Sequence, residues 1–191
     1  MSELKNIVDA VTIADAIILL KNLISTPSFS KEENKTADIL EQFLQDRNIK
    51  SNRYLNNVWV TNKYFDPAKI TLLLNSHHDT VKPNAGYTLN PFEPIEQEEK
   101  LFGLGANDAG GPLVALLATF IHFYEADIPF NIIFAGTAEE EISGKNGVEI
   151  LLHHLPKIDC AIVGEPTLMK MAVAEKGLLV LDCVAYGMAG H

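Results

Sequence analysis

The chain has 191 residues, of which 47% are hydrophobic, and its 25 acidic against 15 basic residues give a formal net charge of -10. This length and hydrophobic content suffice for a domain with a substantial core. The negative charge argues against nucleic-acid binding, which needs clustered lysine and arginine. No apolar stretch is long and uninterrupted enough to span a bilayer, and the first residues lack the plan of a signal peptide. We therefore expect a cytoplasmic protein with neither a nucleic-acid nor a membrane partner.

Helical and strand patterns alternate along the chain. They predict, in order, helices at 11–24 and 31–47, strands at 58–60 and 70–75, a helix at 113–124, a strand at 131–135, a helix at 146–153 and a strand at 159–163. Ser30 with Glu33 three residues on has the spacing of a capping box that would open the second helix. The alternation predicts an α/β layered domain with a mixed sheet.

The last part of the chain holds one more strand-like run, at 178–186, and we place a domain boundary near its start. The two cysteines, Cys160 and Cys183, both lie in apolar strand-like runs. We therefore expect buried thiols and no disulfide framework.

The strand predicted at 70–75 runs into His77, which stands two residues before Asp79. A carboxylate beside the second ring nitrogen is a common support for a zinc-binding histidine, because it fixes the tautomer and raises the basicity of the ligand. By itself the pair is more typical of a structural histidine at the edge of a loop than of a metal ligand. If the strand geometry continues, His78 points away from His77.

Further acidic groups each follow another strand-like run: Asp108, the run at 139–141, and Glu165. Small residues follow Asp108, and they allow the backbone to pass close to a metal before a helix starts. The acidic run alone would be typical of a solvated helix start. Ligands of open α/β sheets collect at the carboxyl ends of strands, so we expect these groups to converge in one crevice. One histidine with several carboxylates suits zinc or a similar divalent ion in a catalytic site.

Four motifs occur in order along nearly the whole chain: Ser-His-His-Asp-Thr-Val at 76–81, Gly-Ala-Asn-Asp-Ala-Gly-Gly at 105–111, Thr-Ala-Glu-Glu-Glu at 137–141 and Gly-Glu-Pro-Thr at 164–167. Together they resemble the di-zinc family of acetylornithine deacetylase, succinyl-diaminopimelate desuccinylase, aminoacylase and carboxypeptidase G. The resemblance implies a three-layer α/β sandwich of the zinc exopeptidase kind, with a mixed, mostly parallel sheet.

The resemblance also implies a ligand set for two Zn²⁺ ions, with Co²⁺ able to substitute. His77 and Glu165 would bind one ion, Asp108 would bridge both, and Glu141 would bind the second. Many relatives have the motif Asp-Met-Lys-Gly-Gly here, whereas this chain has Asp-Ala-Gly-Gly, which is one residue shorter and has no lysine. The metal ligand Asp108 is therefore present, but the positive charge of that lysine is not.

The catalytic roles follow from the same resemblance. Asp79 would orient His77, and Glu140 would be the general base that takes a proton from the attacking water and delivers it to the leaving amine. His191 matches a histidine that, in dimeric relatives, reaches the active site of the partner subunit and stabilises the tetrahedral oxyanion.

Members of this family are about twice as long as this chain and have a catalytic domain interrupted by an α+β lid. A single domain usually has about 100 to 200 residues, which is close to the length of this chain. The resemblance therefore implies an N-terminal portion, in which 1–176 belong to the catalytic domain and 177–191 begin the lid or dimerisation domain. The final histidine ligand of the second zinc would lie in the other half, and the full-length enzyme would be a homodimer.

The substrate implied is an N-acyl amino acid. The run at 174–182 and the shortened motif at 107–111 look most like acetylornithine deacetylase, which implies hydrolysis of N-acetyl-L-ornithine to L-ornithine and acetate in arginine biosynthesis. A desuccinylase of succinyl-diaminopimelate, or a dipeptidase or carboxypeptidase of the same family, is the alternative. The missing final ligand also leaves open a non-catalytic metal-binding or dimerising module.

Overall fold

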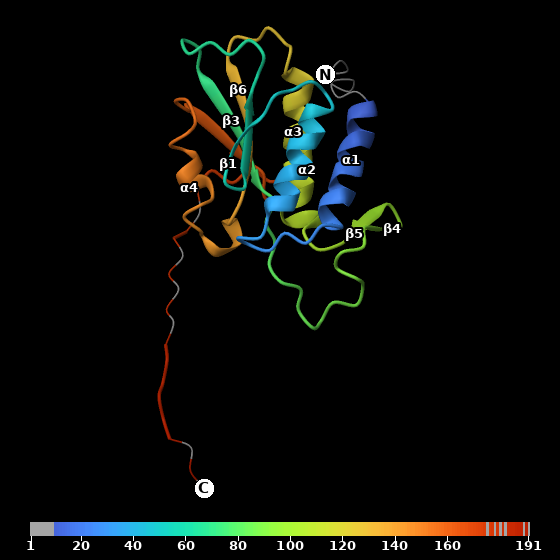
Figure 1. The fold of residues 1–191 in the computed structure, drawn as a ribbon, viewed down its shortest axis with the longest axis vertical. Coiled ribbons are helices and arrows are strands. Elements are labelled where there is room, and N and C mark those ends of the chain that lie inside the picture. The colour runs from blue at the N-terminus through green and yellow to red at the C-terminus, as the bar shows by residue number, and fades with distance from the viewer. Residues whose placement is uncertain are drawn as a thin grey trace.

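The fold is that of a computed structural model, which describes residues 10–174, 176–177, 179, 181, 183–188 and 190. Its elements in chain order are α1 (Ala10–Ile24), α2 (Asn34–Gln45), β1 (Asn52–Tyr54), β2 (Asn57–Thr61), β3 (Thr71–His77), β4 (Ile95–Gln97), β5 (Lys100–Phe102), the π-turn η2 (Ala106–Gly110), α3 (Gly111–Phe123), β6 (Asn131–Thr137), the 3₁₀ turn η3 (Glu140–Ile142), α4 (Val148–Leu151) and β7 (Cys160–Val163). Figure 1 shows their arrangement. None of the helices described has the length and apolar character needed to cross a bilayer.

Five strands form the central sheet in the order β1-β2-β6-β3-β7, and β4 pairs with β5 in a separate hairpin. β3 runs parallel to both β6 and β7, whereas β2 is antiparallel to β1 and to β6. The sheet is therefore mixed, as predicted. The carboxyl ends of β3, β6 and β7 meet at one edge, where open α/β sheets place their ligands.

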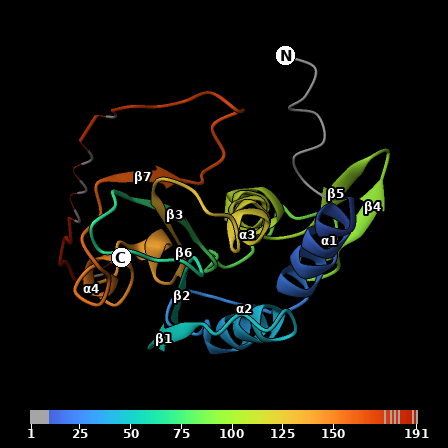
Figure 2. The same cartoon turned by 90° about the horizontal axis from the view of Figure 1, so that it is seen from above.

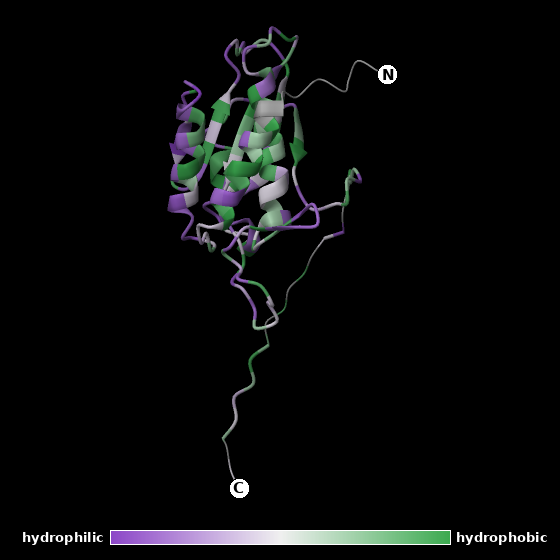
Figure 3. Ribbon diagram, turned by 90° about the vertical axis from the view of Figure 1, so that its right-hand side faces the viewer, coloured by the Kyte–Doolittle hydropathy of each residue, from purple (hydrophilic) through white to green (hydrophobic). Residues whose placement is uncertain are grey.

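Helices cover both faces of this sheet. Seen from above, α1, α2 and α3 lie on one side and α4 on the other (Figure 2). The alternation of side chains along β3 explains both contacts, because Leu74 joins the core under α1, α2 and α3 while Leu73 joins a second core with Leu151 of α4. The hydropathy colouring shows the sheet and the inner helix surfaces as mainly hydrophobic (Figure 3). The three-layer α/β sandwich is confirmed.

Two local predictions around the site are wrong. The second helix begins only at Asn34, with Glu33 as its N-cap and no side-chain capping bond, so the capping box does not form. The Ser30 hydroxyl instead donates to the Asp79 carboxylate. Asp108 does not close a strand, because β5 belongs to the separate hairpin and Asp108 lies in the π-turn before α3.

The predicted burial of the cysteines is also wrong, since Cys160 and Cys183 are both exposed. All four residues of β7 are exposed, because β7 is an edge strand whose one partner among the described residues is β3. Of the strand predicted at 178–186, the described residues 179, 181 and 183–186 lie in no strand. Their side chains are exposed, Tyr186 at 96%. A strand needs a neighbouring strand to take up its backbone hydrogen bonds, and these residues have none among the described residues.

His78, immediately behind the site, is buried and neutral. Its Nε2 lies 2.8 Å from the carbonyl oxygen of Asn56, which can only accept, so Nε2 carries the proton. The Thr36 hydroxyl lies 2.8 Å from Nδ1 and donates to the carbonyl oxygen of Glu33 at 2.9 Å. Burial lowers the pKa of His78 to about 4, against a weaker raising effect of its contact with Asn56.

This depressed pKa predicts a loss of stability in acid. In the unfolded chain His78 becomes protonated below about pH 6.5, whereas in the folded chain it stays unprotonated down to about pH 4. The free energy of unfolding therefore falls as the pH falls through this window. The loss from this residue should be on the order of 3 kcal/mol. Urea unfolding between pH 7 and pH 4 should show this loss of stability in the wild type but not in His78→Gln. The control variant His153→Gln, changed at an exposed site, should lose as much stability as the wild type. Equal pH dependence in His78→Gln and wild type would contradict the assignment.

Candidate metal centre

His77, the last residue of β3, is the centre of the site. Its side chain is fully buried, and Nε2 faces three carboxylates. Nε2 lies 3.1 Å from Oδ1 of Asp108, 3.8 Å from Oε2 of Glu140 and 3.9 Å from Oε2 of Glu165. The structure therefore contains the predicted convergence of these groups, although Asp108 comes from the turn before α3 and not from the end of a strand.

The two flanking carboxylates are positioned by backbone and small residues. The π-turn that carries Asp108 closes through a hydrogen bond from the Gly110 amide to the Gly105 carbonyl, 2.8 Å long. Gly105 has φ 75°, and a Cβ there would lie 2.8 Å from the methyl group of Thr80, so glycine fits this corner best. The segment leading into Glu165 continues the β3 ladder, because the amide of Gly164 donates to the carbonyl of Asn75 at 2.8 Å.

The carboxylate of Asp79 links the histidine to the acidic segment after β6. Nδ1 of His77 lies 3.0 Å from the backbone carbonyl oxygen of Asp79 and 3.3 Å from its Oδ1. The carboxylate also accepts from the amides of Glu140 at 3.0 Å and Glu141 at 3.2 Å. Burial tends to raise the pKa of Asp79, but the hydrogen bonds from His77, Ser30 and the Glu140 amide outweigh it and lower that pKa. Asp79 is thus held as a carboxylate that orients His77 and anchors two successive amides.

The run at 139–141 is a tight turn and not a solvated helix start. Glu139 is buried in the left-handed region at φ 55°, and its carboxylate accepts from the side-chain amide of Asn146 at 2.9 Å. Glu140 and Glu141 follow in the 3₁₀ turn and are less buried. We call residues 139–141 the acidic turn.

Electrostatics in the site favour a bound cation. Burial would lower the pKa of His77, but the hydrogen bond and charge of Asp79, with the charges of Glu165 and Glu140, raise it to about 9. Burial raises the pKa of both Glu141 and Glu165, and the charges of neighbouring carboxylates add to this effect while the charge of His77 opposes it. Several carboxylates around one imidazole repel one another, and a divalent ion relieves that repulsion.

The donors fit such an ion. One atom each from His77, Asp108 and Glu165 lie within 4.8 Å of one another, which gives one nitrogen and two oxygen donors around a common point. Three protein donors with an open position are the pattern of a catalytic zinc site. Among the described residues Glu141 lies outside this trio, although the charge of Asp108 acts on it. His191 lies outside the described residues.

Sequence reasoning missed the polar residues that support the site from behind: Ser30, Glu33, Asn56, Asn57 and Glu139. The Asn57 side chain accepts from the Ala138 amide at 3.1 Å and donates to the Asn146 carbonyl at 2.7 Å, which braces both ends of the acidic turn. The one available signal, the spacing of Ser30 and Glu33, was equally typical of a helix cap.

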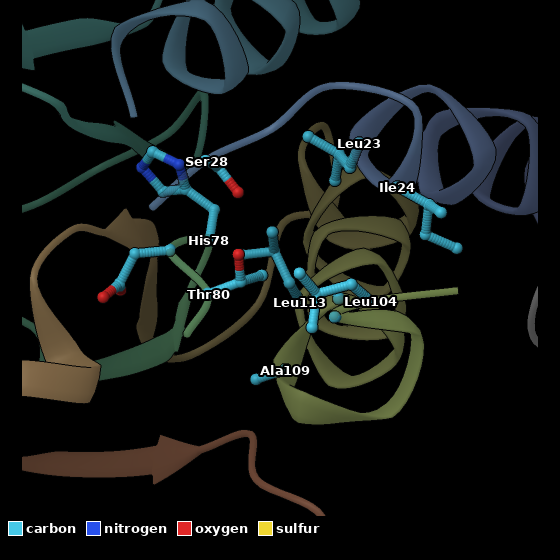
Figure 4. Close-up of a pocket in the computed structure, with 11 residues that line it drawn as sticks. Leu23, Ile24, Ser28, His78, Thr80, Leu104, Ala109 and Leu113 are labelled. Atoms are coloured by element: carbon cyan, nitrogen blue, oxygen red, sulfur yellow. The ribbon is translucent and has the colours of Figure 1, made fainter. Parts of the chain in front are cut away.

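A small, partly open space lies between the site and helices α1 and α3. Its volume is about 20 Å³, which fits one water molecule. Figure 4 shows its lining, with polar residues on one side and apolar ones on the other: Ser28, His78 and Thr80, then Leu23, Ile24, Leu104 and Leu113. The carboxylates of Asp108 and Glu140, by contrast, are about half exposed, so a ligand can reach them from solvent.

The chain resembles named proteins over most of its length. It is 30% identical over 190 residues to succinyl-diaminopimelate desuccinylase of Rickettsia bellii (strain OSU 85-389), covering 90% of this chain and 49% of that protein. It is also 30% identical over 188 residues to acetylornithine deacetylase of Buchnera aphidicola subsp. Acyrthosiphon pisum (strain Tuc7), covering 92% of this chain and 49% of that protein. The chain thus spans about half the length of the curated relatives it matches.

The fold has solved counterparts. A dinuclear metal-binding peptidase of the M20 family from Bacillus subtilis superposes with a TM-score of 0.59 at 17% identity, covering 81% of this chain and 43% of that one. Residues 73–176, just over half of the chain, match the profile of Peptidase family M20/M25/M40. This segment runs from within β3 past Glu165 and so includes His77, Asp108 and the acidic turn. With the mixed sheet and the carboxylates gathered around the histidine at its edge, the match shows that the chain belongs to Peptidase family M20/M25/M40.

Proposed function

We propose that this chain carries the metal centre of an amidohydrolase that cleaves the amide bond of an N-acyl amino acid. The observation that carries the proposal is the position of His77, whose Nε2 faces the carboxylates of Asp108, Glu140 and Glu165. Membership of the family and the similarity to a deacetylase and a desuccinylase support it.

We assign the ligands of two zinc ions as the family resemblance implies. His77 and Glu165 would hold one ion, Asp108 would be shared by both, and Glu141 would contribute to the second. The trio of His77, Asp108 and Glu165 supports the first ion. When bound, zinc would polarise the scissile carbonyl and lower the pKa of water from 15.7 toward about 7.

The protein's own residues hold and move the protons. Glu140 takes a proton from the attacking water and returns it to the leaving amine, and its carboxylate, 3.8 Å from Nε2 of His77, lies close enough to the metal ligands for that role. Asp79 keeps His77 in the tautomer that leaves Nε2 free, because it faces Nδ1. We assign His191 to the oxyanion in a homodimer, on the resemblance alone.

The substrate we favour is N-acetyl-L-ornithine, and the net charge of -10 is compatible with the ammonium group of its side chain. The similarity to succinyl-diaminopimelate desuccinylase, at the same 30% identity, keeps that diacid derivative as the second candidate. Dipeptides are the third. A non-catalytic metal-binding module is the candidate of another class, and Glu140 argues against it because metal binding alone needs no base beside the ligands.

Zinc content is the first test. The described trio provides one nitrogen and two oxygen donors for a single ion, so elemental analysis after dialysis should find about one tightly bound zinc per chain. His77→Ala should lose it, whereas His153→Ala should not. No retained zinc in the wild type would remove the metal assignment, and two would mean that another donor completes the second site.

Glu140→Gln tests catalysis separately from binding. Because an amide cannot accept the proton, kcat should fall by about 10²- to 10⁴-fold while zinc content stays unchanged. Initial rates on N-acyl amino acids with the zinc-loaded protein measure this, and Glu149→Gln, an exposed glutamate of α4, is the matched control. Turnover that survives in Glu140→Gln would exclude Glu140 as the base.

Substrate preference is measured by comparing kcat/KM for N-acetyl-L-ornithine, N-succinyl-L,L-diaminopimelate and a dipeptide. We expect the first to exceed the others by about tenfold or more, equivalent to about 1.4 kcal/mol of transition-state binding. A faster reaction with the succinyl compound or the dipeptide would overturn the choice of substrate but not the amidohydrolase activity.

A further inference from the structure

Glu33 is a fully buried carboxylate that the proposed mechanism does not use. It accepts three hydrogen bonds, and all three donors are neutral amides. They are the backbone of Lys31 at 2.6 Å, the side chain of Asn56 at 2.8 Å and the backbone of Glu139 at 3.2 Å. A buried carboxylate is costly unless it is well bonded, so an arrangement of this kind has to be built into the fold.

The contact with Glu139 joins distant parts of the chain, since the two residues are 106 positions apart. Glu139 occupies the left-handed region and is the residue from which the chain turns into Glu140 and Glu141. The neighbouring amides are held by Asp79, with Glu140 on Oδ1 and Glu141 on Oδ2. Three successive backbone amides of the acidic turn therefore donate hydrogen bonds to two carboxylates, those of Glu33 and Asp79.

The ordinary role of an acid at this position is to cap a helix. Glu33 is the N-cap of α2, where a negative charge suits the helix dipole. Its side chain, however, makes no capping hydrogen bond to α2 and turns instead toward Asn56 and Glu139. Capping thus does not account for the direction of the carboxylate.

We propose that Glu33 is a positioning residue, which fixes the acidic turn so that Glu140 faces the reacting water and Glu141 faces the metal. The inference rests on the proposed function for the role of Glu140, but the contact with Glu139 exists independently of it. Asn56 holds the second carboxylate oxygen of Glu33 and so completes the support from the β1-β2 turn.

Two conservative variants separate reach from charge. Glu33→Asp keeps the charge at the N-cap but is one methylene shorter, so it cannot reach the Glu139 amide. Glu33→Gln loses the charge but keeps an acceptor oxygen at the same distance, and the Asn56 amide can turn to accept from its nitrogen.

Misplacement of a catalytic group by about 1 Å can lower the rate of reaction about 100-fold. We therefore expect kcat to fall about 10- to 100-fold in Glu33→Asp and by less than about threefold in Glu33→Gln. KM and zinc content should be unchanged in both, and Glu32→Asp, at the exposed neighbouring position, is the matched control.

Amide hydrogen exchange gives a readout that needs no turnover. In Glu33→Asp the amide of Glu139 should exchange about tenfold faster, while the amides of β3 and β6 keep their wild-type protection. Unchanged exchange at Glu139 would overturn the proposal, and so would equal losses of kcat in Glu33→Asp and Glu33→Gln. If the wild type cleaves no N-acyl amino acid, the proposed function fails, and exchange at Glu139 alone decides the role of Glu33.

Discussion

The arrangement of the site depends on one carboxylate, that of Asp79. It is fully buried and accepts from Ser30 at 2.7 Å as well as from the amides of Glu140 and Glu141, while its Oδ1 faces the ring of His77. A left-handed residue followed by helical ones points successive amides to one side and forms a small concavity that binds anions. Here the anion is a side chain of the protein, so the histidine at the end of β3 and the turn after β6 are fixed relative to one another.

A layer of neutral hydrogen bonds lies behind that carboxylate. His78 joins Thr36 of α2 to the carbonyl of Asn56, and Asn57 holds the chain on either side of the acidic turn. The short antiparallel strands β1 and β2 contribute no group that faces the metal ligands, yet the turn between them supports the residues that do. Buried networks of this kind are rigid only when every member is bonded, so each residue depends on the others.

Much of the fold could be predicted from periodicity. The strands at β3, β6 and β7 and the helices α1 and α3 were found because their apolar residues follow the period of each element, and strand ends then indicated where His77, the acidic turn and Glu165 would meet. Asp108 was found by its motif, although its local structure is a π-turn. The residues behind the site were not found, because their role depends on contacts such as the one between Glu33 and Glu139, which no local pattern records. The exposure of Cys160 was missed for a related reason, since an apolar strand sequence does not reveal whether its neighbours cover it.

The edge strand β7 has a consequence for how the chain behaves at high concentration. Ile162 and Val163 are 49% and 57% exposed, and within the described residues the backbone groups of β7 that point away from β3 have no neighbouring strand. An uncovered apolar edge is a template for intermolecular strand pairing. Self-association of this chain would then extend the sheet from one molecule into the next.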